Sequence, residues 1–266
     1  MDNRPIGVFD SGVGGLTVVS EFFRELPGEE IIYFGDTARV PYGCKSKEII
    51  TKYSTQIVNF LLGKNVKAVV IACGTVSSNC FDYLTQRFDI PMLGVVTSGA
   101  YSCCDTTKNK KVGVIGTQRT IVSGAYEKII KELNPEISVY SKACPLFVPL
   151  AEEGWVENEV AEKTAQIYLR DFADYGIDTL VLGCTHYPLL LSTIKKAVGN
   201  INIVNPAKSA AVKMKELLAQ KEINSQNEAT NNHTFYVSDN SGMFEKICNL
   251  VLGKTYEAKV IDIEQY

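Results

Sequence analysis

Short runs of apolar residues alternate along the chain with longer segments in which apolar residues recur every three or four positions. The short runs have the length of buried strands, and the longer segments have the period of amphipathic helices. Strands are predicted at 5–9, 30–34, 67–72, 92–95, 111–115, 137–140, 178–183, 202–204, 234–237 and 258–262. Helices are predicted at 15–26, 46–63, 77–87, 119–133, 157–174, 187–198, 206–219 and 240–252. This alternation predicts an α/β fold with a mostly parallel sheet flanked by helices.

Two pairs of strand ends recur at nearly the same interval in the two halves of the chain. Residues 6–11 (IGVFDS) resemble residues 112–117 (VGVIGT), and residues 69–75 (VVIACGT) resemble residues 180–186 (LVLGCTH). Repetition in the same order is the signature of an internal structural repeat. It predicts two similar α/β domains related by pseudo-two-fold symmetry.

The repeat also predicts where the domains divide and where a ligand binds. We expect the first domain to comprise residues 1–96 with 207–266, and the second to comprise residues 97–206. In open α/β sheets the ligand crevice lies beyond the carboxyl ends of the strands. Equivalent strand ends would then face each other across a cleft, and we expect the active site there. The polar stretch 221–233 reads as a connecting loop.

Composition and charge fit a globular protein and exclude several classes of partner. The 266 residues include 27 Lys and Arg against 30 Asp and Glu, a formal net charge of −3. No global charge therefore attracts nucleic acid or an anionic membrane. The chain starts without a basic segment followed by an apolar one, and no apolar stretch approaches the roughly 18 residues that span a bilayer. We expect a cytoplasmic protein.

The chain has eight cysteines, none of them in a CxxC pair, and reduced thiols are the default without a secretory signal. Cys73 and Cys184 differ from the rest because each directly follows an apolar strand and precedes a turn into a helix. Backbone N–H groups and the helix dipole favour a thiolate at such a position. Inverting a stereocentre through a carbanion needs a base on one face and an acid on the other. Two opposed thiols meet that need.

Polar residues next to these strand ends suit a small dianionic amino acid. They are Asp10, Ser11, Thr75, Thr185 and His186. Hydroxyls and backbone amides bind carboxylates, and the Asp10 carboxylate can pair with an ammonium group. The loop 37–43 (TARVPYG) follows another strand at the same sheet edge, which makes it a candidate wall of the cleft.

Two other kinds of site fit the sequence less well. The Gly-rich turn 10–15 (DSGVGG) lacks the spacing of GxGxxG and the lysine of a P-loop, so a nucleotide phosphate site is weakly supported. Cys184 and His186 alternate as metal ligands do, but the only other histidine is His233 and no CxxC or HxxxH partner exists. We expect no metal.

The sequence resembles the glutamate racemases over nearly its whole length. The resemblance is carried by FDSGVGGLTVV (9–19), YFGDTARVPYG (33–43), IACGTVSS (71–78), CPLFVPLAEEG (144–154) and LGCTHYPLLL (182–191). It implies interconversion of L- and D-glutamate without a cofactor, and two α/β domains with the active site between them. It also implies a supply of D-glutamate for peptidoglycan synthesis, and we expect a homodimer.

The resemblance further implies roles for individual residues. Cys73 and Cys184 would be the acid/base thiols, and Asp10, Glu152 and His186 would be their polar partners. The substrate pocket would be lined by Asp10, Ser11, Tyr42, Gly43, Gly74, Thr75, Thr185 and His186. One position departs from the family pattern, which usually has Asn where Gly74 stands. The loss of that amide affects binding of substrate more than the type of reaction.

Two alternatives remain open at this point. A racemase or isomerase of the same superfamily acting on aspartate or a related acid would use the same two thiols. A binding protein or thiol redox sensor that kept the fold would fit the missing amide at Gly74.

Overall fold

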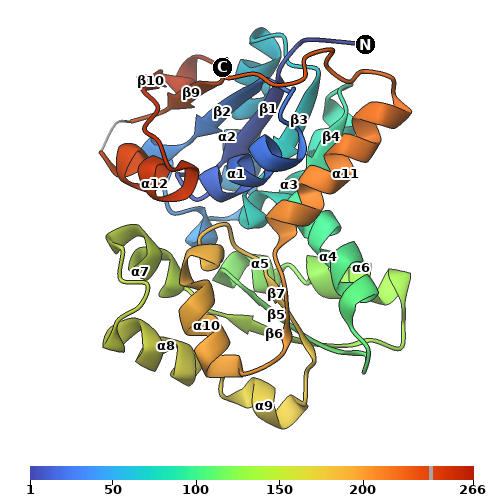
Figure 1. The fold of residues 1–266 in the computed structure, drawn as a ribbon, viewed down its shortest axis with the longest axis vertical. Coiled ribbons are helices and arrows are strands. Elements are labelled where there is room, and N and C mark those ends of the chain that lie inside the picture. Colours follow the sequence, from blue (N-terminus) through green and yellow to red (C-terminus); the bar gives the residue numbers. More distant parts are fainter. Residues whose placement is uncertain (240–241) are drawn as a thin grey trace.

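A computed structural model of the protein describes residues 1–239 and 242–266, and the strands in these ranges form two sheets (Figure 1). The strands are β1 (Ile6–Asp10), β2 (Ile31–Gly35), β3 (Ala68–Ile71), β4 (Met92–Gly94), β5 (Lys111–Gly116), β6 (Ser138–Ala143), β7 (Thr179–Leu182), β8 (Asn202–Val204), β9 (Thr234–Val237) and β10 (Ala258–Val260). Neighbouring strands pair in parallel. The predicted α/β class with mostly parallel sheets is therefore confirmed.

The two sheets share one topology, as the repeat in the sequence predicts. The larger sheet has the order β10-β9-β2-β1-β3-β4, and the smaller has the order β6-β5-β7-β8. The segment β2-β1-β3-β4 thus has the same strand order as β6-β5-β7-β8. In this arrangement β3 corresponds to β7, and the two strands end just before Cys73 and Cys184 respectively.

Helices connect the strands and cover the sheets (Figure 1). The α-helices are α1 (Leu16–Glu25), α2 (Lys47–Gly63), α3 (Gly74–Arg87), α4 (Val95–Thr106), α5 (Gln118–Val122), α6 (Ala125–Leu133), α7 (Phe147–Glu153), α8 (Glu159–Leu169), α9 (Asp171–Tyr175), α10 (Leu191–Val198), α11 (Pro206–Gln220) and α12 (Met243–Leu252). Short 3₁₀ turns are η1 (Thr37–Arg39), η2 (Tyr42–Cys44), η3 (Tyr187–Leu190) and η4 (Ile263–Gln265). No helix in the described part of the chain is long and apolar enough to cross a membrane.

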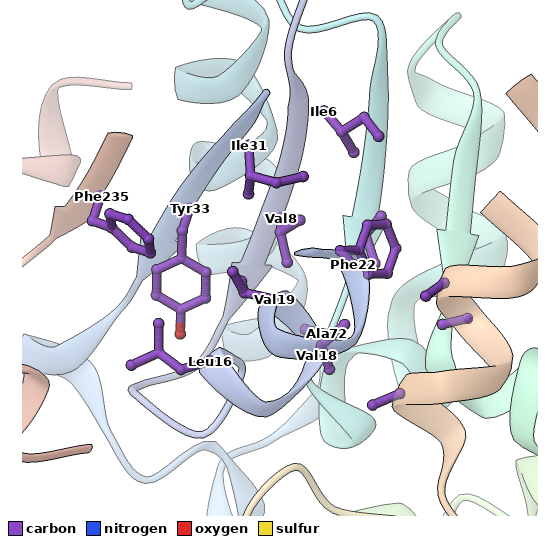
Figure 2. Close-up of a cluster of buried hydrophobic side chains, with 14 of the residues drawn as sticks. Ile6, Val8, Leu16, Val18, Val19, Phe22, Ile31, Tyr33, Ala72 and Phe235 are labelled. Carbon is purple, nitrogen blue, oxygen red and sulfur yellow. The ribbon is translucent and has the colours of Figure 1, made fainter. Parts of the chain in front are cut away.

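The larger sheet is buried on both faces. Along β1, Ile6 and Val8 point into the core formed with α1, α11 and α12, while Phe9 points into the core formed with α2 and α3. Figure 2 shows the first of these cores, in which Leu16 and Phe22 of α1 lie over the sheet. Strands buried on both faces are apolar at nearly every position, which explains the continuous apolar runs in the sequence.

Several helices differ from the sequence predictions. The predicted helix 119–133 is divided into α5 and α6 at Gly124, whose φ is +66°. The predicted helix 157–174 is divided into α8 and α9 at Arg170. Helix α3 begins at Gly74 and not at residue 77, so Cys73 is its N-cap residue. Positions 240–241 of the predicted helix 240–252 lie outside the described residues.

Two helices, α4 and α7, have no counterpart among the helices predicted from the sequence. Helix α4 has the sequence VVTSGAYSCCDT, which is rich in β-branched and small residues with low helix propensity, and it forms because it packs against α11 and α6. Helix α7 contains Pro149, which is tolerated in the first turn because the N–H there needs no intrahelical partner. Both helices matter here, since α4 carries the chain from the larger sheet to the smaller and α7 carries Glu152.

Candidate active site

A cavity of about 380 Å³ lies where the carboxyl ends of strands from both sheets meet. Each sheet contributes the segments that follow its strands, as expected for an open α/β fold. The lining residues are Ser11, Gly12, Val40, Pro41, Tyr42, Gly43, Cys44, Cys73, Gly74, Thr75, Thr117, Gln118, Pro145, Val148, Pro149, Glu152, Cys184, Thr185 and His186. The cavity thus brings together every predicted catalytic and substrate-binding residue except Asp10.

Cys73 reaches the cavity from the end of β3 and is 4% exposed. Its thiol donates a hydrogen bond to Ser11 Oγ at 3.2 Å. Burial raises the pKa of Cys73 to about 12, and the nearby Asp10 carboxylate adds to the effect. The N–H of Val76 in the first turn of α3 opposes this shift. With its pKa raised in this way, Cys73 is a neutral thiol at neutral pH.

Cys184 enters the same cavity from the end of β7 and lies beside a histidine. Its Sγ is 3.8 Å from His186 Nδ1, and His186 Nε2 is 3.0 Å from Glu152 Oε1. Burial alone would lower the pKa of His186, but its hydrogen bonds to Cys184 and Glu152 raise it to about 10. A protonated imidazole gives Cys184 a positively charged neighbour at neutral pH, whereas Cys73 lies near the Asp10 carboxylate. The two thiols are thus held in different electrostatic surroundings.

Asp10, predicted for the substrate pocket, lies next to the cavity and is not among the residues that line it; its Oδ1 accepts a hydrogen bond from Thr185 Oγ1 at 3.5 Å. It is fully buried under the β1–α1 turn, and its Oδ2 accepts a hydrogen bond from the N–H of Gly12 at 3.0 Å. Burial raises the pKa of Asp10, although the positive charge of His186 opposes the shift. In this conformation Asp10 holds the turn below Cys73, and a substrate ammonium group in the cavity cannot touch it directly.

Glycines allow close approach between the two halves of the molecule, which are the larger sheet with its helices and the smaller sheet with its helices. A Cβ atom at Gly14 would lie 2.6 Å from His186 Nδ1, which is closer than any real contact. Gly74 similarly packs against the main-chain oxygen of Gly183, so any side chain at position 74 would collide with it. Glycine is thus explained at position 14 by the close side chains of Thr185 and His186, and at position 74 by the close backbone of Gly183.

The loop after β2 forms one wall of the cavity, as the sequence predicts. Tyr42 is buried and its hydroxyl donates a hydrogen bond to Asp36, which also accepts one from Arg39 Nε at 2.7 Å. Ser238 Oγ donates to the other carboxylate oxygen at 2.8 Å. The Tyr42 hydroxyl is thus hydrogen-bonded to Asp36 and does not point at the cavity. The loop that these hydrogen bonds hold in place brings Gly43 to the cavity wall.

Part of the cavity lining was not predicted from the sequence. Thr117 lies at the end of β5, and its hydroxyl is 2.9 Å from that of Thr75 across the interface. Its equivalence to Ser11 in the repeat was a signal that could have identified it. Gln118 carries no comparable signal. Pro145, Val148 and Pro149 lie in the block 144–154 that carries the family resemblance, but their spacing alone does not distinguish them from core residues. In residues 1–239 and 242–266, no three or more His, Cys, Asp or Glu side chains are grouped so that they could hold a metal ion.

Comparisons with known proteins agree with this geometry. A family model described as Asp/Glu/Hydantoin racemase matches residues 6–214. A glutamate racemase of Geobacter metallireducens is 49% identical over 251 residues, which are 94% of this chain and 93% of that one. One of Neisseria meningitidis serogroup B is 47% identical over 255 residues, covering 96% and 94%.

Solved structures give the same result for the fold. A glutamate racemase isoform from Bacillus anthracis superposes with a TM-score of 0.95 at 38% identity, covering 98% of each chain. The Francisella tularensis glutamate racemase, crystallised in complex with D-glutamate, has a TM-score of 0.93 at 39% identity and covers 100% of each chain. On this evidence the chain belongs to the glutamate racemases of the Asp/Glu/Hydantoin racemase family.

Proposed function

We propose that this protein interconverts L- and D-glutamate without a cofactor, with Cys73 and Cys184 as the two acid/base groups. The observation that carries the proposal is that both thiols line one cavity from equivalent strand ends of the repeated topology. A substrate α-carbon between them would have one thiol on each face. The glutamate racemases that the chain resembles supply the substrate.

The chemistry is a proton transfer on each face of the substrate. One thiolate removes the α-hydrogen as a proton, which leaves a carbanion, and the opposite thiol donates its proton to the other face. One proton leaves the substrate and one proton reaches it. At the end of a turnover the first cysteine is a thiol and the opposite cysteine is a thiolate. Before substrate binds, burial and the Asp10 carboxylate favour the thiol form of Cys73, whereas Cys184 lies beside the His186 imidazolium.

Hydroxyls, main-chain N–H groups, the His186 imidazolium and exclusion of water must stabilise the negatively charged substrate. Among the described residues that line the cavity, none is Arg or Lys. The carboxylates would be bound by hydroxyls such as those of Ser11, Thr75 and Thr185 and by main-chain N–H groups at the strand ends. Charge stabilisation by fixed dipoles in a partly closed site is a large source of rate enhancement.

The two-thiol mechanism is tested by removing each thiol in turn. Cys73→Ala and Cys184→Ala are each expected to lose L- to D-glutamate conversion by about 10³-fold or more, since the reaction then lacks its acid or its base. Circular dichroism in deuterated buffer measures inversion, and proton NMR measures exchange of the α-proton. Full turnover by either variant would rule out the mechanism. Conversion of aspartate in preference to glutamate by the wild type would favour the related activity.

We also propose the location, oligomeric state and metabolic role that the family resemblance implies. The enzyme would work in the cytoplasm as a homodimer of two-domain subunits, divided into 1–96 with 207–266 and 97–206, and would supply D-glutamate for peptidoglycan. Growth of a deletion strain only with added D-glutamate tests the role. Sedimentation equilibrium tests the dimer.

A further inference from the structure

Lys246 joins the two halves of the molecule next to the candidate active site. Its Nζ donates a hydrogen bond to the main-chain oxygen of Glu152 at 2.9 Å. Lys246 lies in α12, whose apolar face packs onto the larger sheet, whereas Glu152 lies in α7, whose apolar face packs into the core of the smaller sheet. In Figure 1, α12 lies directly above α7. The hydrogen bond therefore crosses the interface between the halves.

The end of α7 is suited to a lysine. Carbonyl groups in the last turn of a helix lack partners within the helix, and a cation there also interacts favourably with the helix dipole. Helix α7 ends at Glu153, and Gly154, with a φ of +78°, closes it. A Cβ atom at Gly154 would lie 3.9 Å from Lys246 Cε, so the lysine side chain runs over this end of the helix.

The side chain of Glu152 connects this contact to the reacting thiol. Its carboxylate is 30% exposed, so burial does not fix it, and its described hydrogen bond is to His186. His186 in turn contacts Cys184. A hydrogen bond weakens steeply as its distance and angle depart from the optimum, so a shift of the end of α7 would weaken the support for the imidazolium.

We propose that Lys246 is a positioning residue that holds Glu152 against His186 from across the interface. Contact between the halves then completes a chain of contacts from Lys246 through Glu152 and His186 to Cys184. The link between Lys246 and catalysis rests on the proposed function. Its physical claim, that Lys246 sets the proton affinity of His186, holds with or without turnover.

The test measures the protonation of His186 directly. The chain has two histidines, and their pKa values lie far apart, because His233 is lowered to about 4 by burial while His186 is raised to about 10. Imidazole NMR titration therefore resolves them, and a His186→Gln sample assigns the signals. Lys246→Met is expected to lower the His186 midpoint by about half a pH unit or more. Lys246→Arg keeps a donor and should restore it.

Kinetics give the second readout. Lys246→Met should lower kcat at alkaline pH while KM stays within about twofold, because the substrate contacts are unchanged. Lys215→Met, an exposed substitution on α11, is the matched control and should match the wild type in both measurements. An unchanged His186 midpoint in Lys246→Met, or a lowered midpoint that arginine does not restore, would overturn the proposal. Absence of glutamate racemisation by the wild type would count against the proposed function alone, since the titration needs no turnover.

Discussion

At the residue scale, two cysteines of similar burial lie in different electrostatic fields. Asp10 lies near Cys73, and the negative charge of that carboxylate opposes a thiolate. His186 lies near Cys184 and places a positive charge beside that thiol. The two thiols therefore differ in the charge beside them before substrate binds. Opposite surroundings for two groups of the same kind are a recurring way to assign acid and base roles.

The Glu152 carboxylate should control the alkaline limit of activity. Because its hydrogen bond raises the pKa of His186, Glu152→Gln is expected to lower that pKa, and the imidazolium is then lost at a lower pH. The alkaline limb of the kcat profile should shift to lower pH, by about one unit or more. Racemisation rates between pH 6 and 11 measure the shift. Glu153→Gln, at the next and exposed position, is the control, and equal profiles for the two variants would contradict the assigned role.

At the scale of elements, the sequence predicts the strands and the residues that directly follow them. Parallel strands buried on both faces are apolar throughout, and the groups at their carboxyl ends meet at one edge, so Cys73, Thr75, Cys184 and His186 could be identified before the structure. Helices α4 and α7 could not. Their helical state depends on packing against other elements, which local patterns do not contain.

The apolar cavity wall at 145–149 was not predicted as part of the site for a related reason. Pro145, Val148 and Pro149 line the cavity, but apolar residues at such spacing are typical of any core segment. Asp10 differs from its predicted position in the depth of its side chain. Its position after a strand predicted a place in the pocket, whereas the fold buries it one layer below. Sequence spacing locates a residue along the strand and does not give the depth of its side chain.

A buried ion pair fastens the connecting segment 221–233 to the larger sheet. Lys67 Nζ is 2.6 Å from Glu29 Oε2 and donates hydrogen bonds to the main-chain oxygens of Asp2 and Ile223. Glu29 Oε1 accepts a hydrogen bond from the N–H of Ser225 at 2.8 Å. This polar cluster therefore holds the chain at the end of the sheet opposite the cavity.

Breaking this pair from one side should destabilise the fold. Lys67→Met leaves Glu29 buried without its partner, and the expected loss is about 3 kcal/mol in the free energy of unfolding. Urea denaturation followed by circular dichroism measures it. The double variant Lys67→Met with Glu29→Gln removes the uncompensated charge and should recover part of the loss. A single variant as stable as the wild type would show that the pair contributes nothing.

At the scale of the whole molecule, the active cavity exists only because the two halves are in contact. Hydrogen bonds cross the interface around it: Thr75 to Thr117, Arg119 Nε to the oxygen of Lys45 at 2.9 Å, and Thr17 Oγ1 to the oxygen of Thr185 at 2.9 Å. These contacts are made by segments that also line or adjoin the cavity. The separation of the halves thus sets the distance across which the two thiols must act.

Gly74 is where this separation is most tightly fixed. The main chain at Gly74 packs against the carbonyl oxygen of Gly183, the residue before Cys184. The Asn that the family usually has at this position would need the halves to move apart or the backbone to shift. Gly74, at which the family resemblance implies a lost amide, is therefore also the residue that permits the observed contact between the halves.

Introducing a side chain at position 74 should therefore harm the enzyme and not repair it. Gly74→Asn and Gly74→Ala are both expected to cost about 1–3 kcal/mol of stability by overpacking. Both should also reduce kcat/KM by about tenfold or more, because small displacements of reacting groups are costly. Thermal unfolding and racemisation kinetics measure the two effects. Gly63→Ala, at a position with open space around it, is the control and should behave as the wild type. A lower KM in Gly74→Asn alone would mean that the halves adapt to the side chain and that the amide binds substrate, which would refute the close packing as a constraint.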